Sequence, residues 1–452
     1  MILILLAAGC ALGPDYERPE IEEPVAFEQT IDDGASLANL EWWEVFQDPA
    51  LQELIETALE QNDNLAIAAA RVEEARARLG FVRADQFPQI DGRAGASRGN
   101  RADLIVPGAG INESYILAAD LSWELDIWGK LRRSTEAARA ELLATEDTRQ
   151  TVIITLIADV ASAYFLLRDL DARREIAAQT VVTREESVRI NSARFEKGIA
   201  PLIDVNQAEI LVADAAAEFY SIERQIVETE NLLSVLLGRN PRSIVRGRSL
   251  ADQPIPPAVP VGLPSELLNR RPDVRSAEQV LAAQTARIGV AEALRLPSLS
   301  LTGTLGRASD DISDLTNGNS KLWSVGGDLL GPIFDAGKTK SNVEVERART
   351  EQALNQYELT ILQAFSEVEN ALAGIRNFRD ESAARTKQVA AAQSAAMLSQ
   401  ARYDGGVTSY LEVLDSDRSL FDAALAESAT RRLQLVSIVE LYKALGGGWV
   451  SN

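Results

Sequence analysis

The 452-residue chain contains no histidine and a single cysteine, Cys10. Histidine and cysteine are the usual protein ligands of zinc and copper, and histidine is the commonest general base. No Asp or Glu pair accompanies a glycine-rich phosphate loop or a nucleophile elbow, which leaves a carboxylate-based hydrolase as a distant alternative. The sequence therefore predicts a protein that is not an enzyme and that has no metal site and no catalytic cofactor.

Positive charge is also scarce, with 45 basic against 67 acidic residues and a net charge of -22. Phosphate groups would be repelled by this excess, so nucleic acid is excluded as a partner. Aromatic residues make up only 6% of the chain, whereas a quarter of it is charged. This composition predicts a globular chain without a membrane-spanning helix beyond its first residues.

The amino terminus has the pattern of a bacterial lipoprotein signal. An apolar run, Leu5-Leu6-Ala7-Ala8-Gly9, ends in small residues directly before Cys10. Residues 1–9 are thus expected to be a signal peptide and Cys10 a lipidation site, with a short buried segment and an incidental thiol as the alternative. No Lys or Arg precedes the run, which departs from the pattern and favours an earlier start. Residues 10–40, with Pro14, Pro19 and Pro24, predict an extended segment lying on the body.

The rest of the chain contains an internal repeat, whose second copy lies 208 or 209 residues after the first. The string RFEKGIAPLIDV from Arg194 corresponds to RYDGGVTSYLEV from Arg402, and residues 126–130 correspond to 334–338. Internal repeats of this kind predict two equivalent structural units. We place them at residues 41–245 and 265–449, with a linker at 246–264.

Each copy contains a long helical pattern. Residues 130–196 include no Pro and no Gly, and their apolar residues recur at alternating spacings of three and four, interrupted by Arg174, Arg184 and Asn191. This is a coiled-coil pattern, and such a helix would be roughly 100 Å long. Glycines end both long helices, after which we expect Pro201 at a first helical position and Ser409 with Glu412 in a capping box. The patterns predict helical hairpins at about 130–236 and 336–445.

Ahead of each hairpin the apolar period changes to two, at about 88–98, 115–128, 297–307 and 322–334. In the second of these segments Leu121, Trp123 and Leu125 alternate with polar residues. Strands of about ten residues with one apolar face are typical of transmembrane β-barrels, whose smallest bacterial members have about eight strands. Four strands cannot close a barrel, so several chains would share one; the alternative is a soluble sheet covered by helices. The predicted fold is mainly α with a small β part.

In order along the chain, several motifs resemble the outer-membrane factor family, the TolC-like efflux channels, and within it the lipoprotein subgroup of OprM and NodT. The matches are Cys10, residues 13–16 (GPDY), Trp42-Trp43, residues 126–130, residues 270–273 (RRPD) and the two strings from Arg194 and Arg402. The resemblance implies a homotrimer in the outer membrane of a Gram-negative bacterium, lipid-anchored, with a 12-stranded β-barrel and a trimeric α-barrel through the periplasm. It also implies a passive duct serving a periplasmic adaptor and an inner-membrane pump of the RND type.

The same resemblance implies two sets of site residues. The gate would consist of Tyr403, Glu412, Asp415 and Arg418, and the adaptor would contact the hairpin tips at Lys197, Gly198, Ile199, Asp204, Gly405, Gly406, Val407 and Thr408. Simpler roles stay open: Tyr403 as an apolar-stripe residue like Phe195, Glu412 as a helix cap, and Asp415 with Arg418 as a solvated pair. Thr408 stands where some relatives carry a basic residue. The alternative function is a soluble periplasmic coiled-coil scaffold or adaptor.

Overall fold

The computed structural model describes residues 11–21, 24, 27–28, 45–100, 111–255, 264–316 and 318–447. The chain forms two compact units, each assembled from separate stretches of both sequence copies. One unit comprises Met1–Ile21, Ala70–Asp147 and Ser276–Leu359, and the other comprises Glu22–Ala69, Thr148–Arg275 and Thr360–Asn452. The repeat boundaries at 41–245 and 265–449 remain predictions from the sequence, because the compact units are divided along different lines.

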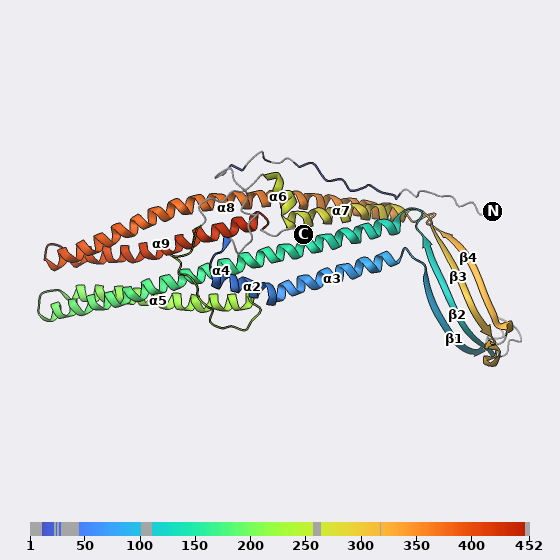
Figure 1. Ribbon diagram of the computed structural model, residues 1–452, viewed down its shortest axis with the longest axis horizontal. Helices are drawn as coiled ribbons and strands as arrows, with labels where there is room; N and C mark the ends of the chain where they lie inside the picture. Colours follow the sequence, from blue (N-terminus) through green and yellow to red (C-terminus); the bar gives the residue numbers. More distant parts are fainter. Residues whose placement is uncertain are drawn as a thin grey trace. The chain divides into compact units, whose positions relative to one another are not determined.

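The first unit contains one antiparallel sheet of four strands in the order β1-β2-β3-β4 (Figure 1). The strands are β1 (Gln89–Asn100), β2 (Ile111–Leu125), β3 (Ser298–Ser309) and β4 (Lys321–Leu330). Each copy supplies one strand hairpin, and the two hairpins join through β2 and β3, where Trp123 lies opposite Leu301. Four strands are present at the predicted places, although β2 ends before the expected residues 126–128 and β4 ends before the expected residues 331–334.

The two faces of this sheet differ in polarity, as the alternating sequence predicts. Ile90, Leu121 and Val325 lie in one cross-strand row through Gly303, and Val325 is 81% exposed. The neighbouring Asp120 is on the opposite face, where it pairs with Arg93 at 3.1 Å and accepts a hydrogen bond from Thr304 at 2.7 Å. In the described part of the chain this row is exposed, with Ile90 at 70% and Val325 uncovered by helices, so the alternative of a sheet buried under helices is wrong.

Two helical hairpins of equal length follow the two strand hairpins in sequence (Figure 1). The first is α4 (Lys130–Glu196) with α5 (Leu202–Leu236), and the second is α8 (Lys338–Asp404) with α9 (Tyr410–Ala444); in each the members have 67 and 35 residues. Shorter helices precede the strands: α2 (Pro49–Gln61), α3 (Asp63–Ala84), α6 (Pro264–Arg270) and α7 (Pro272–Ala293). Two 3-10 turns, Ile312–Thr316 and Gly318–Ser320, lie between β3 and β4.

The long helix α4 contains a stretch that, by length and composition, is apolar and long enough to cross a membrane. Among the described residues it is the one helix of this kind, and 56% of the stretch is buried. Leu156, Val160, Leu167 and Leu170, all members of the predicted apolar stripe, are buried there. The stretch is therefore accounted for as the core of the helical unit.

A buried carboxylate organises the core beside α2. Asp48 is fully buried and caps α2 by accepting the Ala50 amide at 3.0 Å. It also accepts hydrogen bonds from Tyr164 at 2.8 Å, Gln253 at 2.6 Å and the Arg248 amide at 3.0 Å. Burial by itself would raise the pKa of Asp48, but these four donors hold it below its usual value. The network ties two distant segments of the chain, at Tyr164 and at residues 248–253, to one ionised side chain.

The RRPD motif has a similar bracing role. Arg271 is buried and forms an ion pair with Asp273 at 2.6 Å and with Glu367 of α8 at 2.7 Å. Its guanidinium also donates to the carbonyl oxygen of Ala444, at the end of α9, at 2.9 Å. A buried charge with several acceptors is stable only while all are present. The motif thus connects α7 to both helices of the second hairpin.

Residues 11–21 lie on the first unit, as expected for the segment that follows the cysteine. The Leu12 amide donates to the Trp128 carbonyl at 3.1 Å, and buried Arg133 donates to the Leu12 carbonyl at 3.1 Å. Gly13 contacts Gly289 so closely that a β-carbon on Gly13 would lie 2.4 Å from the Gly289 α-carbon. This contact requires glycine at both positions. Cys10 itself and residues 1–9 lie outside the described residues.

Candidate functional site at the helical tips

Both helical hairpins of the second unit turn through the same backbone arrangement. Gly198 and Gly406 adopt positive φ angles of 70° and 69°. The Ile199 amide donates to the Arg194 carbonyl at 2.9 Å, and the Val407 amide donates to the Arg402 carbonyl at 3.0 Å. This is the Schellman end of a helix, in which a left-handed glycine lets the chain reverse and satisfies the last carbonyl groups.

The restart of each returning helix differs from the expected capping. Pro201 is the cap residue in extended backbone, and α5 begins at Leu202. Ser409 caps α9 by position, but its side chain makes no capping hydrogen bond. The Glu412 carboxylate instead pairs with Arg402 at 3.0 Å and accepts a hydrogen bond from Thr408. The capping box is therefore wrong, because a guanidinium offers a carboxylate a stronger, charge-assisted bond than a backbone amide does.

Tyr403 connects the second hairpin to the first. Its hydroxyl group lies 3.0 Å from Asn191 Oδ1 on α4 and 3.2 Å from Asp204 Oδ2 in the first turn of α5. Its ring packs against Tyr410 with centroids 5.1 Å apart. Burial and then the nearby Asp204 charge raise the pKa of Tyr403, although Arg194 opposes them. The side chain is both a member of the apolar stripe, like Phe195, and a polar link between the hairpins, and its role in a gate stays a prediction.

Arg194 of α4 makes a second link to the same hairpin. Its guanidinium pairs with Asp404 at 2.8 Å, and its central carbon lies 4.8 Å from the centroid of the Tyr403 ring. Gln400 also donates to Asp404, at 3.1 Å. The hydrogen bond from Arg194 is the main cause that lowers the pKa of Asp404. Cation, ring and carboxylate form one cluster that spans both tips.

Asp415 and Arg418 contact each other as predicted, but both lie on the surface of a single helix. Their side chains form an ion pair at 2.9 Å on α9 and are 70% and 61% exposed. Solvated pairs of this kind stabilise a protein by only about 0.2–1 kcal/mol. The described residues place the two side chains together without joining the hairpins through them.

The outermost residues of both tips are apolar and uncovered. Ile199 is 72% exposed and Val407 is 71% exposed. Lys197, Gly405 and the two turn glycines are exposed beside them. Within the described ranges, no group of three or more acidic side chains is placed to hold a metal ion. The chemistry offered here is that of a contact surface.

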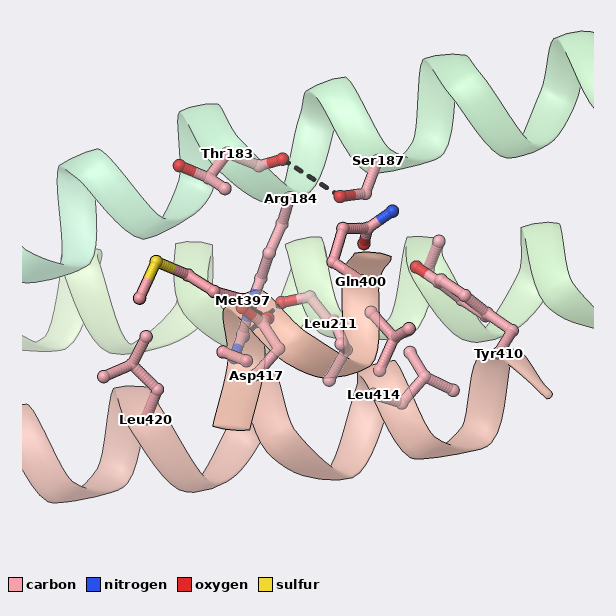
Figure 2. Close-up of a pocket in the computed structure, with 13 residues that line it drawn as sticks. Thr183, Arg184, Ser187, Leu211, Met397, Gln400, Tyr410, Leu414, Asp417 and Leu420 are labelled. Atoms are coloured by element: carbon pink, nitrogen blue, oxygen red, sulfur yellow. Dashed lines mark hydrogen bonds and ion pairs between the residues drawn. The ribbon is translucent and has the colours of Figure 1, made fainter. Parts of the chain in front are cut away.

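Sequence reasoning missed Arg184, which Figure 2 shows reaching from α4 toward Asp417 and Leu211. It is 2% exposed, pairs with Asp417 of α9 at 2.9 Å and donates to the Leu211 carbonyl of α5 at 2.7 Å. Its central carbon also lies 4.9 Å from the centroid of the Phe421 ring. The signal was present in the sequence, because an Arg that interrupts an apolar stripe needs a buried acceptor.

The chain belongs to the outer membrane efflux protein family. The family model, described as "Outer membrane efflux protein", matches residues 54–239 and 263–447, two stretches whose first residues are 209 apart, in agreement with the internal duplication. The solvent efflux pump outer membrane protein SrpC of Pseudomonas putida is 36% identical over 99% of this chain and 97% of its own.

Solved structures of outer-membrane channels have the same fold. The channel OprN has a TM-score of 0.90 and 32% identity, covering 97% of this chain and 100% of its own. The open state of the MtrE channel of Neisseria gonorrhoeae has a TM-score of 0.88 and 32% identity, covering 97% and 98%. The predicted family and fold class are confirmed by these matches.

The family defines the function in general terms. The protein is an outer-membrane channel of a Gram-negative bacterium that works with an efflux pump, as the channel component of a tripartite efflux system. Because the family consists of channels, the expectation that the chain is not an enzyme is confirmed. The alternative of a soluble periplasmic scaffold is replaced by the channel.

Proposed function

We propose that three copies of the chain form one channel, closed by a shared 12-stranded barrel. The observation that carries this proposal is the open four-stranded sheet with an uncovered apolar face. In the described part of the sheet, β1 and β4 each pair on one side only, and lipid cannot satisfy the backbone groups of a free edge. Joining β4 of one copy to β1 of the next removes every edge when three copies complete the ring.

The duct is passive and its cargo is chosen by the inner-membrane pump, which we propose to be of the RND type. Support comes from the range of cargo in the names of similar proteins. SrpC is named for solvent efflux, and the 32% identical CusC of Escherichia coli is named as a cation efflux system protein. One channel architecture that serves solvents and cations is not itself the selective element.

The periplasmic adaptor docks on the hairpin tips, at the residues from Lys197 to Asp204 and from Gly405 to Glu412. The exposed Ile199, Leu202 and Ile203 of the first tip and Val407 and Leu411 of the second support this assignment, because exposed apolar residues that are gathered in one place mark a contact surface. Both turns present the same backbone, so an adaptor with repeated tips could bind either. Replacing Ile199 and Val407 with Asp should abolish adaptor capture while leaving the isolated channel intact.

A lipid on Cys10 anchors the chain beside the barrel. Residue 11 packs at the base of β2, where a β-carbon on Gly129 would lie 2.6 Å from the Ala11 α-carbon. Trp128, an aromatic residue of the kind enriched at membrane interfaces, donates to the Pro297 carbonyl nearby at 2.7 Å. Mass spectrometry of the mature amino terminus should detect an acylated Cys10, and Cys10→Ser should remove that mass.

The gate is formed by the polar links at the second tip, with Tyr403 as the main link and Glu412, Asp415 and Arg418 lining the constriction. The contacts of Tyr403 with Asn191 and Asp204 support the first role. For Glu412 and Asp415, threefold symmetry would produce rings of like charge that attract cations. The arrangement with these contacts formed is the closed one.

Purified full-length protein in a planar lipid bilayer tests the proposal as a whole. A trimer by native mass spectrometry, with low and cation-selective conductance, is expected. Asp415→Ala should weaken the cation selectivity, whereas Asp422→Ala, on the same helix and outside the proposed gate, serves as the control. A monomer that is recovered without detergent and gives no conductance would refute the shared barrel.

A further inference from the structure

Arg184 is a buried cation that contacts both hairpins. Two of its contacts stay within the first hairpin, where Nη1 lies 2.7 Å from the Leu211 carbonyl oxygen and 3.7 Å from Asp214 Oδ2, both on α5. Two contacts cross to the second hairpin, where Nε donates to Asp417 Oδ2 on α9 at 2.9 Å and the guanidinium carbon lies 4.9 Å from the centroid of the Phe421 ring, also on α9. The second copy of the sequence has Ala392 at the position equivalent to Arg184, so this cation occurs in the first hairpin alone.

The four helices leave an open pocket beside this cation. A cavity of about 390 Å³ borders Arg184 and is lined by residues of α4, α5, α8 and α9, among them Met397 and Leu414 (Figure 2). Apolar packing also joins the hairpins here, because Ala208 of α5 belongs to the same buried apolar cluster as Leu414 of α9. The ion pair between Arg184 and Asp417 adds a charged contact between the hairpins beside that cluster.

Moving α9 away would leave a buried guanidinium without its main counter-ion, which is strongly unfavourable. The structure provides a replacement. Nη2 of Arg184 is buried without a hydrogen-bond partner, so the guanidinium has an unused donor. The Asp214 side chain is 62% exposed and already within 3.7 Å, so it is free to turn inward. The charge stays paired whether or not α9 is in place.

We infer that Arg184 is a latch between the hairpins that exchanges carboxylate partners as the channel opens. It binds Asp417 in the closed channel and Asp214 in the open channel, while its bond to the Leu211 carbonyl persists in both. This inference rests on the proposed gating by hairpin movement. Arg184 would then be a positioning residue away from the tips. Its partner Asp417 favours the closed channel, and its partner Asp214 favours the open channel.

Two isosteric variants test the exchange, with open probability in planar bilayers as the readout. Asp417→Asn removes the closed-state partner and should raise the open probability about tenfold, since a hydrogen bond to a charged group is at stake. Asp214→Asn removes the open-state partner and should lower it about threefold, because the less direct contact is the one lost. A variant that merely loosened the helices would raise it in both cases.

Changes in the same direction, or no change in either intact trimer, would overturn the latch. If Asp417→Asn does not assemble, Asp214→Asn decides alone, because its expected decrease is opposite to the effect of general loosening. Tyr403→Phe separates the latch from the gate. If that variant opens the channel while both Asp variants behave as wild type, the latch is wrong and the gate stands; if none of the three changes opening, the gate proposal fails.

Discussion

The two helical tips have the same backbone conformation, but side chains at equivalent positions contact different partners in each tip. Arg194 and Asp204 in the first tip correspond to Arg402 and Glu412 in the second, 208 residues later. In the second tip the pair closes on itself, with Arg402 and Glu412 3.0 Å apart. In the first tip both residues contact the other hairpin instead: Arg194 pairs with Asp404, and Asp204 accepts a hydrogen bond from the Tyr403 hydroxyl group.

Two substitutions between the copies account for this difference in partners. Tyr403 has Phe195 as its counterpart, so a hydroxyl group that needs an acceptor exists in the second copy alone. Asp204 is shorter than Glu412 by one methylene group, and it meets that hydroxyl group instead of its own arginine. The two copies thus have equal turns, but their side chains differ. The second tip forms an ion pair within its own hairpin, whereas the first tip forms contacts with the other hairpin.

The strongest way to break this asymmetry is to remove both cross-links at once. Tyr403→Phe combined with Arg194→Gln deletes the hydroxyl bond, the pair with Asp404 and the cation–π contact, together about 2 kcal/mol. The open probability in planar bilayers should rise about thirtyfold. Glu223→Gln, a surface change on α5, is the control. A double variant that opens no more than this control would show that the cross-links do not hold the gate.

The comparison is sharpened by changing one arginine at a time. Arg194→Gln should raise the open probability about threefold, because a half-exposed pair and a cation–π contact contribute about 0.7 kcal/mol together. Arg402→Gln, at the equivalent position, breaks a bond inside one hairpin and should change opening less than Arg194→Gln does. Both are measured in the same bilayer assay; equal effects would contradict the assignment of the first pair to the gate.

Acidification should weaken the cross-linked tip selectively. The hydrogen bond from Arg194 holds the pKa of the Asp404 carboxyl below the usual value for an aspartate. A lowered pKa means that the pair stabilises the closed state fully above that value, and the contribution is lost as the pH falls through the lowered pKa. Opening should therefore increase below about pH 4. Asp404→Asn should abolish this component of the pH dependence, and an unaltered profile would count against the pair.

The smallest expected difference concerns the two turns themselves. Gly198 and Gly406 have nearly equal positive φ angles, and a β-carbon at either would meet nothing within 4 Å. Alanine should therefore cost about 1 kcal/mol at each, from backbone strain alone. Thermal unfolding of the two variants should show matching shifts. Clearly unequal shifts would mean that the tips are not equivalent in backbone.

The local elements were predictable because each depends on residues close in sequence. The α4 bounds, Lys130–Glu196, coincide with the predicted helix, since a run without Pro or Gly and with a 3.5-residue period leaves little choice. The four strands followed from a period of two. Capping was less predictable: the expected box at Ser409 and Glu412 failed because Arg402, on the preceding helix, competes for the carboxylate.

The candidate site was predictable as a place and less so as a set of contacts. Resemblance directed attention to Tyr403 and the tips, and the structure adds Asn191 and Asp204 as its partners. Arg184 was noticed only as an interruption of an apolar stripe. Its partner Asp417 is 233 residues away, and a single sequence does not state which of several carboxylates will meet a buried arginine.

By itself the sequence determined the duplication, the helical hairpins, the strand hairpins and the membership of a channel family, because periodicity and motif order are properties of neighbouring residues. Only the tertiary structure decided how the copies were used differently. Arg194 and Arg402 occupy equivalent positions in almost the same string, yet one bridges the hairpins and the other does not. That choice depends on which acceptor the packed helices bring within about 3 Å, a distance that no local pattern encodes.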